Sequence, residues 1–387
     1  MVSSPATDLS PADDPGALAL RFEGRVWPYL RLCLVNSALT LASFGLYGPW
    51  AKVRQRRYLY SHIFLADHSF DYHASPWALL RSRVIVTAVI AGLALLPELF
   101  SFHLITSAVL AVITGLLPLG LLPWLVVQAL RFQSRCVSFR HLRFGFGGRS
   151  GPLAREAFWL GILRLLVPLS LGLLQPYTAW RVRRFLIANR RYGNTPARFS
   201  ASPADFLRLH RRGLLVLVAV LLVLVPLWML MVGGFTKLLQ EIFGQMSESL
   251  MAGSIPADPM HRVRLALLLL LVTLTLTLAL PQVWLTYLEA GAARITWNQT
   301  SLGGLRIGCT WRWPDLLRLR LLHGLLVILS FGLLAPWARI RGLRYRLGRI
   351  SVGPAMQLQS FLASDQEVVS AIGEEAADLY GLLPFDW

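Results

Sequence analysis

Four apolar runs constrain the fold of this chain more than any other feature of its sequence. They cover about residues 83–101, 106–130, 213–235 and 264–288, and ionisable side chains stand only at or near their ends. Each run approaches or exceeds the ~20 residues that a helix needs to cross the roughly 30 Å hydrocarbon core. Inside a bilayer the backbone must satisfy its own hydrogen bonds, which restricts such runs to helices. We therefore expect four membrane-spanning helices, arranged as two hairpins.

Composition supports a membrane location and argues against a soluble globular domain. Of the 387 residues, 55% are hydrophobic and 15% are charged, and the mean hydropathy is +0.54. Soluble domains carry about 25% charged residues. The formal net charge of +18 suits either nucleic acid or an anionic membrane surface. Because the arginines flank the apolar runs, we expect anionic membrane lipids as partners and no nucleic acid.

The two ends of the chain are acidic. Residues 1–20 contain three Asp, residues 351–387 contain six Asp and Glu, and neither end contains Lys or Arg. An acidic start has the wrong sign for the basic region of a signal peptide. Near the other end, Ser364 and Glu367 have the spacing of a capping box, which predicts a short acidic helix over about 364–380.

Three further apolar stretches, at about 29–48, 158–176 and 316–335, are shorter and more polar. Arginines are dense on both sides of the second and third stretches, and cytoplasmic flanks are enriched in Arg and Lys. We therefore expect these stretches to enter or lie along the cytoplasmic leaflet without crossing it, with both termini inside. The alternative is seven simple spans with the N-terminus outside.

The predicted fold class is an all-α polytopic membrane protein with small cytoplasmic β connectors and an internal three-fold repeat. It has four spanning helices plus three re-entrant or interfacial segments. Segments 69–73, 142–146 and 302–307 alternate apolar and polar residues, or nearly so, and are the predicted strands. The predicted organisation is an acidic N-terminal tail (1–20), repeat copy 1 (21–82), transmembrane hairpin 1 (83–130), repeat copy 2 (131–212), transmembrane hairpin 2 (213–288), repeat copy 3 (289–350) and an acidic C-terminal helix and tail (351–387).

A Gly-Leu-x-x-Pro-aromatic segment, which we call the motif, occurs three times. An Arg follows each motif proline at five and at eight positions, and the copies keep a constant register over long distances. Glycine relaxes the backbone and proline cannot continue a helical hydrogen-bond ladder. We therefore predict a helix break in each copy, formed by Gly45 and Pro49, Gly172 and Pro176, and Gly332 and Pro336.

After each break, the residues one, five and nine positions beyond the proline share one helical face. In the first copy this face places Arg54 between Trp50 and Tyr58, a stripe suited to lipid phosphates. The alternative is a plain interfacial anchor with snorkelling arginines. The predicted lipid-binding or interface residues are Trp50, Arg54, Arg57, Tyr58, Tyr177, Arg181, Arg184, Phe185, Trp337, Arg341, Arg344 and Tyr345.

The first copy resembles the signature of a known family. The residues are Asn36, Leu39-Thr40, Gly45-Leu46-Tyr47-Gly48-Pro49-Trp50-Ala51-Lys52-Val53-Arg54, Arg57-Tyr58 and Phe70-Asp71-Tyr72-His73. Together with Gly373-Glu374-Glu375 near the C-terminus, they are similar to the YjgN-like bacterial inner membrane proteins. The resemblance implies a protein of the bacterial cytoplasmic membrane with no assigned activity or catalytic residue. The second copy departs from the pattern, with Tyr177-Thr178-Ala179-Trp180 where Trp-Ala-Lys is expected.

Catalytic and metal-binding motifs are weak. The one His/Asp cluster consists of His62, His68, Asp71 and His73, and the other copies lack it. We interpret these residues as hydrogen-bonded connector residues, and we expect no metal, catalytic residue or cofactor. The three cysteines lie far apart, which argues against a disulfide framework or a zinc site. The four apolar runs also lack the buried carboxylates that drive ion-coupled transport.

Three functions stay open on these grounds. The first is a non-enzymatic membrane protein that binds or moves an anionic lipid or a small solute through the repeat region. The second is a membrane scaffold whose acidic tail or connectors recruit a cytoplasmic partner. The third is a lipid-modifying enzyme that uses His62, Asp71 and His73. We favour the first.

Overall fold

The computed structural model describes residues 17–99, 103–252 and 259–354, which form two compact units. The first unit contains the described residues up to Phe206, residues 293–310, and the described residues from Leu329 onward. The second contains 207–292 and 311–328. The predicted acidic C-terminal helix and most of the N-terminal tail lie outside the described residues.

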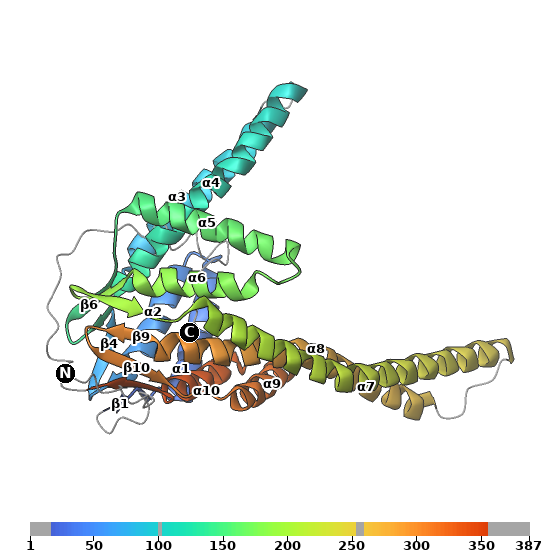
Figure 1. Ribbon diagram of the computed structural model, residues 1–387. Coiled ribbons are helices and arrows are strands. Elements are labelled where there is room, and N and C mark those ends of the chain that lie inside the picture. Colours follow the sequence, from blue (N-terminus) through green and yellow to red (C-terminus); the bar gives the residue numbers. More distant parts are fainter. Residues whose placement is uncertain (1–16, 100–102, 253–258, 355–387) are drawn as a thin grey trace. The chain divides into compact units, whose positions relative to one another are not determined.

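The first unit is built around one antiparallel sheet of eleven short strands, several of which are labelled in Figure 1. Their order in the sheet is β1-β11-β10-β9-β8-β7-β6-β5-β4-β3-β2. β1 and β2 are consecutive in the chain but stand at opposite ends of this order, so the sheet curls into a near-barrel. The strands are Leu18–Ala19 (β1), Arg21–Phe22 (β2), Ile63–Leu65 (β3), His68–Tyr72 (β4), Val137–Phe139 (β5), Leu142–Phe146 (β6), Arg190–Tyr192 (β7), Thr195–Phe199 (β8), Thr300–Leu302 (β9), Leu305–Cys309 (β10) and Ile350–Gly353 (β11).

Residues 18–22, which we call the strap, close the near-barrel. β1 pairs with residues 351–352 of β11, and β2 pairs with residues 63–64 of β3. Between the two strands, the Leu20 N–H donates a hydrogen bond to the carbonyl of Ile350 at 3.0 Å. One five-residue segment therefore joins both edges of the sheet.

Helices attach to one rim of the near-barrel only. α2 (Gly48–Ser61), α4 (Leu104–Cys136), α6 (Gln175–Ala188), α8 (Pro259–Asn298) and α10 (Ala335–Leu347) each lead into an odd-numbered strand. Because neighbouring strands are antiparallel, the odd-numbered strands from β3 onward all start at the same rim, which we call the helical rim. Two-residue turns at 66–67, 140–141, 193–194 and 303–304 lie at the opposite rim, the turn rim.

The all-α prediction and the three-fold architectural repeat are wrong. A strand hairpin follows each of α2, α4, α6 and α8, and α10 leads into β11, which pairs with β10 and the strap. The recurring unit thus follows the long apolar helices as well as the motif helices. Predicted strands 69–73 and 142–146 correspond to β4 and β6, whereas 302–307 contains the turn between β9 and β10. Strands of three residues are too short to show a clear alternating period.

The described residues of each apolar run lie within one helix, in α3 (Pro76–Leu99), α4, α7 (Pro203–Ala252) and α8. Of the four predicted spans, three helices are long and apolar enough to cross a membrane within the described ranges, namely α3, α4 and α7. In α8 the apolar stretch found there is shorter, Val263–Thr275.

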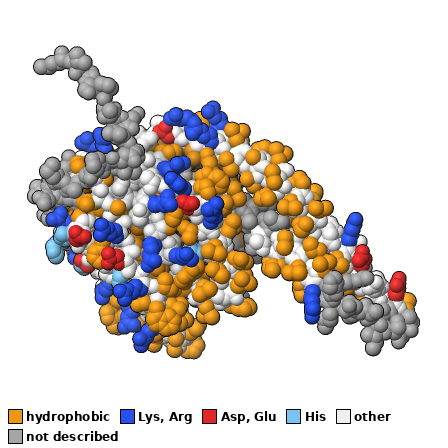
Figure 2. All heavy atoms as spheres, turned by 90° about the horizontal axis from the view of Figure 1, so that it is seen from below, with side chains coloured by type: hydrophobic (Ala, Val, Ile, Leu, Met, Phe, Trp, Pro, Cys, Tyr) orange, Lys and Arg blue, Asp and Glu red, His pale blue; other side chains and the backbone are white. Residues whose placement is uncertain are grey.

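The long helices expose large apolar side chains. Ile105 of α4 is 81% exposed and Leu222 of α7 is 72% exposed. Figure 2 shows hydrophobic side chains over much of the visible surface, while charged side chains lie on the broader part of the view and again near its right-hand tip. Apolar surface on this scale indicates contact with lipid, and it agrees with the predicted membrane location.

The three shorter apolar stretches form α1 (Val26–Ala42), α5 (Ser150–Leu169) and α9 (Trp313–Leu329), and each ends at a motif copy. Gly45, Gly172 and Gly332 have φ values of 87°, 83° and 88°. The N–H of Gly172 donates to the carbonyl of Val167 at 2.9 Å, the hydrogen bond of a Schellman C-cap. The break therefore occurs at the glycine, and the motif proline opens the next helix, as in α2, α6 and α10.

A serine hydroxyl in each break bonds the backbone just before the second helix begins. The hydroxyls of Ser43, Ser170 and Ser330 accept hydrogen bonds from the N–H four residues on, at 2.9, 3.2 and 3.1 Å. A side-chain oxygen here satisfies one of the donors that a helix N-terminus leaves open. The motif is therefore longer than its sequence definition and begins two residues before the glycine.

The second unit contains α7, α8 and α9 apart from their ends. α7 packs closely on α8, because a Cβ at Gly213 would lie 3.0 Å from the ring of Trp284. Arg320 of α9 forms an ion pair with Glu289 of α8 and donates to the hydroxyl of the fully buried Thr286 at 3.3 Å. These contacts tie α9 to α8.

Replacing Gly172 by Ala should destabilise the first unit by about 1–2 kcal/mol, because a Cβ disfavours the left-handed backbone at this position. The control is Gly92→Ala inside α3, where a Cβ meets no atom and helix propensity improves. Thermal unfolding in detergent measures the difference. An unchanged Tm for Gly172→Ala contradicts the assigned turn.

Single cysteines in place of His68, Arg143 and Asn194 mark three exposed positions at or next to the turn rim. In a Cys33→Ala background, a membrane-impermeant maleimide should label all three from the same side of the membrane. The dense arginines predict that this side is the cytoplasm. Labelling of one position from the other side contradicts the common rim.

Candidate functional site

A cavity of about 380 Å³ lies inside the near-barrel of the first unit. Alternate residues of a strand point to opposite faces, so every second residue of these short strands reaches the interior. The strands and the strap contribute Leu20, Ile63, Leu65, Phe70, Phe139, Phe144, Tyr192, Leu302, Leu305, Ile307, Ile350 and Val352. Helix ends at the helical rim contribute Leu59, Tyr60, Leu130, Gln133, Ser134, Ile187, Trp297, Leu343 and Leu347.

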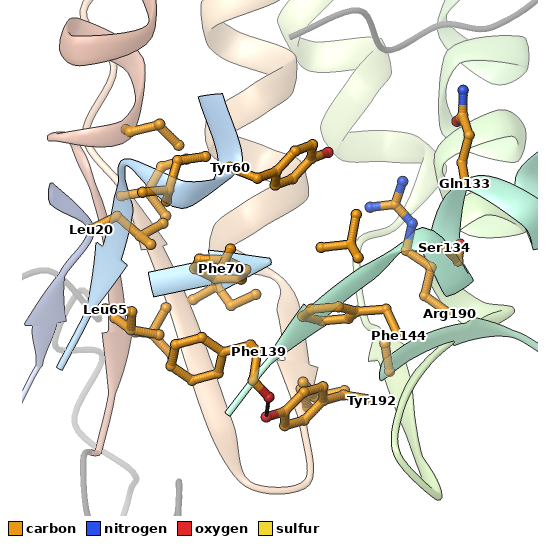
Figure 3. Close-up of a pocket in the computed structure, with 18 of the residues that line it drawn as sticks. Leu20, Tyr60, Leu65, Phe70, Gln133, Ser134, Phe139, Phe144, Arg190 and Tyr192 are labelled. Atoms are coloured by element: carbon orange, nitrogen blue, oxygen red, sulfur yellow. Dashed lines mark hydrogen bonds between the residues drawn. The ribbon is translucent and has the colours of Figure 1, made fainter. Parts of the chain in front are cut away.

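Aromatic side chains line the part of the cavity next to the turn rim. Phe139 and Tyr192 are the last residues of β5 and β7, and they are buried in one cluster with Leu65 and Leu305. The ring centroids of Phe144 and Tyr192 lie 4.9 Å apart. Figure 3 shows this aromatic group below the polar side chains of the cavity.

The hydroxyl of Tyr192 is already engaged. It donates a hydrogen bond to the carbonyl of Phe139 at 2.8 Å, drawn as a dashed line in Figure 3. Burial raises the pKa of Tyr192 to about 12, so the hydroxyl stays protonated at neutral pH. This end of the cavity therefore presents apolar surface to a ligand.

Positive charge lies toward the helical rim. Arg190 is the first residue of β7 and stands at that rim, whereas Arg56 belongs to α2 and Arg339 to α10. With a rise of 1.5 Å per residue, Arg56 and Arg339 lie roughly 8 and 12 Å back from the strand-proximal ends of their helices. No Asp or Glu stands among the described residues that line the cavity.

Arg191 borders the cavity but faces outward. It is exposed, and its guanidinium lies against Gly147, where there is no room for a side chain. Gly145, its partner across the strand pair, also lacks a side chain. The inward-facing cations are thus Arg56, Arg190 and Arg339.

The inward arginines sit among tyrosines. Burial lowers the pKa of the Arg190 guanidinium, and its charge interacts with Tyr60. In Figure 3 the Arg190 and Tyr60 side chains reach toward each other across the upper part of the cavity. Arg56 donates a hydrogen bond to the Tyr72 hydroxyl at 3.0 Å, and Tyr60 stacks on Tyr72 with centroids 5.5 Å apart.

This arrangement suits binding better than covalent chemistry. An arginine stays protonated in proteins, and a charge in an apolar enclosure is stabilised by a partner of opposite sign. The described lining contains no His, Cys, Asp or Glu to act as base or nucleophile. The hydroxyl of Ser134 donates to the carbonyl of Leu130 at 2.8 Å within its own helix. The cavity therefore combines an end that carries arginines with an apolar end.

The twelve residues predicted from the motif lie outside this cavity. Tyr177 and the side chains of Arg54, Arg57, Arg184, Arg341 and Arg344 are exposed, while those of Trp50, Arg181, Trp337 and Tyr345 are half-buried. Several cations stack on rings near them in the chain. The distances from guanidinium carbon to ring centroid are 5.7 Å for Arg54 on Tyr47, 5.3 Å for Arg184 on Trp180, 5.1 Å for Arg341 on Trp337 and 4.6 Å for Arg349 on Tyr345.

Two predicted residues face inward and support the packing. The Tyr58 hydroxyl donates to the carbonyl of Arg25 at 2.9 Å and accepts from its N–H at 3.0 Å. Phe185 is buried against Phe146, with centroids 5.8 Å apart. Arg344 also reaches back to the carbonyl of Gly24, at 3.0 Å. The predicted aromatic–Arg–aromatic face is therefore divided between exposed and buried sides.

The predicted His/Asp cluster is dispersed. His62 hydrogen-bonds the carbonyl of Tyr58 at 2.7 Å, His68 that of Ala66 at 2.8 Å, and His73 the hydroxyl of Ser138 at 2.7 Å. Within the described ranges, no group of three His, Cys, Asp or Glu side chains has the arrangement of a metal site.

Sequence reasoning missed the cavity because it treated the strands as connectors. The turns of the sequence already indicated hairpins. Gly193-Asn194 and Gly303-Gly304 are two-residue turns, and each lies between a segment of three residues and a segment of five, as in tight hairpins. The same spacing recurs around Ala66-Asp67, where both residues have positive φ. No local pattern marks Arg56, Arg190 and Arg339 as inward-facing among so many arginines.

Comparison with known proteins gives one family. A family model described as "Bacterial protein of unknown function (DUF898)" matches residues 17–379. A curated relative, "Inner membrane protein YjgN" of Salmonella typhimurium, is 35% identical over 132 residues, which is 33% of this chain and 31% of the relative. Proteins of the same name in Escherichia coli O157:H7 and K12 are 28% and 27% identical over 37% and 39% of this chain and 34% and 35% of their own length. The chain thus spans about a third of the length of these relatives, and no solved structure matches it.

Tyr192→Phe should lower the free energy of unfolding by about 1 kcal/mol, because it removes one buried hydrogen bond. The control is Tyr177→Phe, at an exposed position on α6. Denaturant unfolding in detergent compares the two. Equal stability of both variants contradicts the assigned hydrogen bond.

Proposed function

Since the chain belongs to the DUF898 family of bacterial proteins of unknown function, and its curated relatives are inner membrane proteins, we propose that it binds an anionic lipid or small anionic solute in the barrel cavity. The family resemblance of the first motif copy is confirmed by these matches. We further propose a multi-pass arrangement with cytoplasmic termini, supported by the arginine-rich segments between the apolar helices.

One observation carries the proposal. Three inward arginines and no described carboxylate line a cavity whose remaining surface is mostly apolar. The three arginines are half-buried, and a cation in a mostly apolar cavity favours a ligand of opposite charge. Ligand cavities are typically about 300–1,000 Å³, apolar, and furnished with a few polar groups that orient the ligand, and this cavity falls in that range.

The motif residues form a second, separate proposal. Phe44, Leu171 and Phe331, each next to a motif glycine, are 97%, 93% and 97% exposed and have positive φ. Bulky apolar side chains in such a backbone are strained, and strain is retained where it has a use. We propose that these side chains, with the exposed arginines of the motif helices, contact membrane lipid.

Native mass spectrometry in mild detergent can separate the two sites. The cavity variant is Arg56→Gln, Arg190→Gln, Arg339→Gln, and the motif variant is Arg54→Gln, Arg181→Gln, Arg341→Gln. Arg54 and Arg56 lie on one helix, as do Arg339 and Arg341, so the variants match in charge and largely in location.

The cavity variant should bind the tightly held anion at least tenfold more weakly than the wild type, because each hydrogen bond to a charged group contributes about 1.5–3 kcal/mol. The motif variant should keep it and lose only weakly retained lipid. If only the motif variant loses the tightly bound anion, the anion binds at the motif and the proposed cavity site is wrong.

A further inference from the structure

The cavity has chemically different ends, and this asymmetry restricts what fits. Arg190 and Tyr60 reach toward each other in the upper part of the cavity, and Phe139 and Tyr192 lie in its lower part (Figure 3). Leu305 is buried in one cluster with Phe139 and Tyr192 near the turn rim. From these two ends we propose that the ligand is a single-chain anionic amphiphile, such as a long-chain carboxylate. Its headgroup lies at Arg190 and its chain among the aromatic side chains. This inference rests on the proposed binding function.

The volume favours one chain over two. At about 380 Å³ the cavity lies near the lower end of the roughly 300–1,000 Å³ range of ligand pockets. A diacyl phospholipid, with two long chains and a phosphorylated headgroup, is too large to be enclosed there. A single saturated chain with a small head matches this volume.

The charge distribution indicates one anionic head. Arg190 is at the rim itself, while the Arg56 guanidinium is held by the Tyr72 hydroxyl and ring, with 5.9 Å to the ring centroid. A carboxylate at the rim therefore meets Arg190 first, on the side of the cavity that Tyr60 also faces. Guanidinium and carboxylate geometries match for paired hydrogen bonds.

The other end excludes a second polar group. The one hydroxyl there, that of Tyr192, already donates to the carbonyl of Phe139. Phe139, Tyr192 and Leu305 are 3%, 4% and 3% exposed, so a polar group placed at this end would not be solvated by water. Burying a polar group without a partner is unfavourable, so the far end of the ligand must be apolar.

The experiment uses the wild-type protein and a matched series of probes. Dodecanoate, its methyl ester, dodecanedioate and a dipalmitoyl phosphatidylglycerol are each added at equal concentration, and binding is counted by native mass spectrometry. Dodecanoate should bind at one per chain, and the ester and the diacid at least tenfold more weakly. The phospholipid should not displace it.

Two variants locate the head and the tail. Arg190→Gln should weaken dodecanoate at least tenfold, and Arg191→Gln, the outward neighbour, should leave it unchanged. Phe139→Trp, which fills the apolar end, should weaken dodecanoate more than octanoate. A diazirine at the last carbon of the chain should crosslink near Phe139 or Leu305, and one near the carboxylate should crosslink near Tyr60.

The outcomes distinguish this inference from the function on which it rests. If none of the four probes binds but the Arg56→Gln, Arg190→Gln, Arg339→Gln variant still loses the tightly bound anion, the single-chain class is wrong and the binding function stands. If that variant also keeps the anion, both fail. If phosphatidylglycerol binds the cavity and dodecanoate does not, the function stands and the single-chain class is wrong. Equal binding of the ester or the diacid, or a chain-end crosslink near Tyr60, overturns the assigned orientation.

Discussion

The structure of the first unit depends on the pairing of one five-residue strap with both edges of its sheet. Strands of two to five residues are too short to be stable by themselves, and an open edge leaves N–H and C=O groups without partners. Because residues 18–22 pair with β11 on one side and β3 on the other, neither edge stays open. The side chain of Leu20, between the two pairings, then becomes part of the cavity wall. The pairing that closes the sheet therefore also completes the wall of the cavity.

The direction of the strands also sets the polarity of the cavity. Every strand that follows a helix starts at the helical rim, so residues at helix–strand junctions, Arg190 among them, lie at that end. Residues that precede the tight turns lie at the opposite end, and in this chain they are Leu65, Phe139, Tyr192 and Leu302. A simple alternation of helix and hairpin therefore separates cations from apolar side chains without any long-range sequence signal.

Membrane location, the helices and the positions of the three breaks followed from the sequence, because long apolar runs and Gly-Pro spacing are strong local signals. Two of the three predicted strands, over 69–73 and 142–146, were also found. The near-barrel was missed because its register is set by pairing between segments far apart in the chain, such as Leu18 with Val352. The site was missed for the same reason. The direction of an arginine side chain depends on the helix or strand that carries it, and composition does not predict that direction.

The same short basic segments supply two different surfaces. Residues two apart on a helix differ by about 200° in direction, and adjacent residues of a strand point to opposite faces. Arg54 and Arg56, Arg339 and Arg341, and Arg190 and Arg191 therefore each place one cation inward and one outward. The basic side chains behind the net charge of +18 therefore do not all face outward toward anionic lipid. Part of it is enclosed in an apolar cavity, where solvent screens it little and its preference for an anion is strongest.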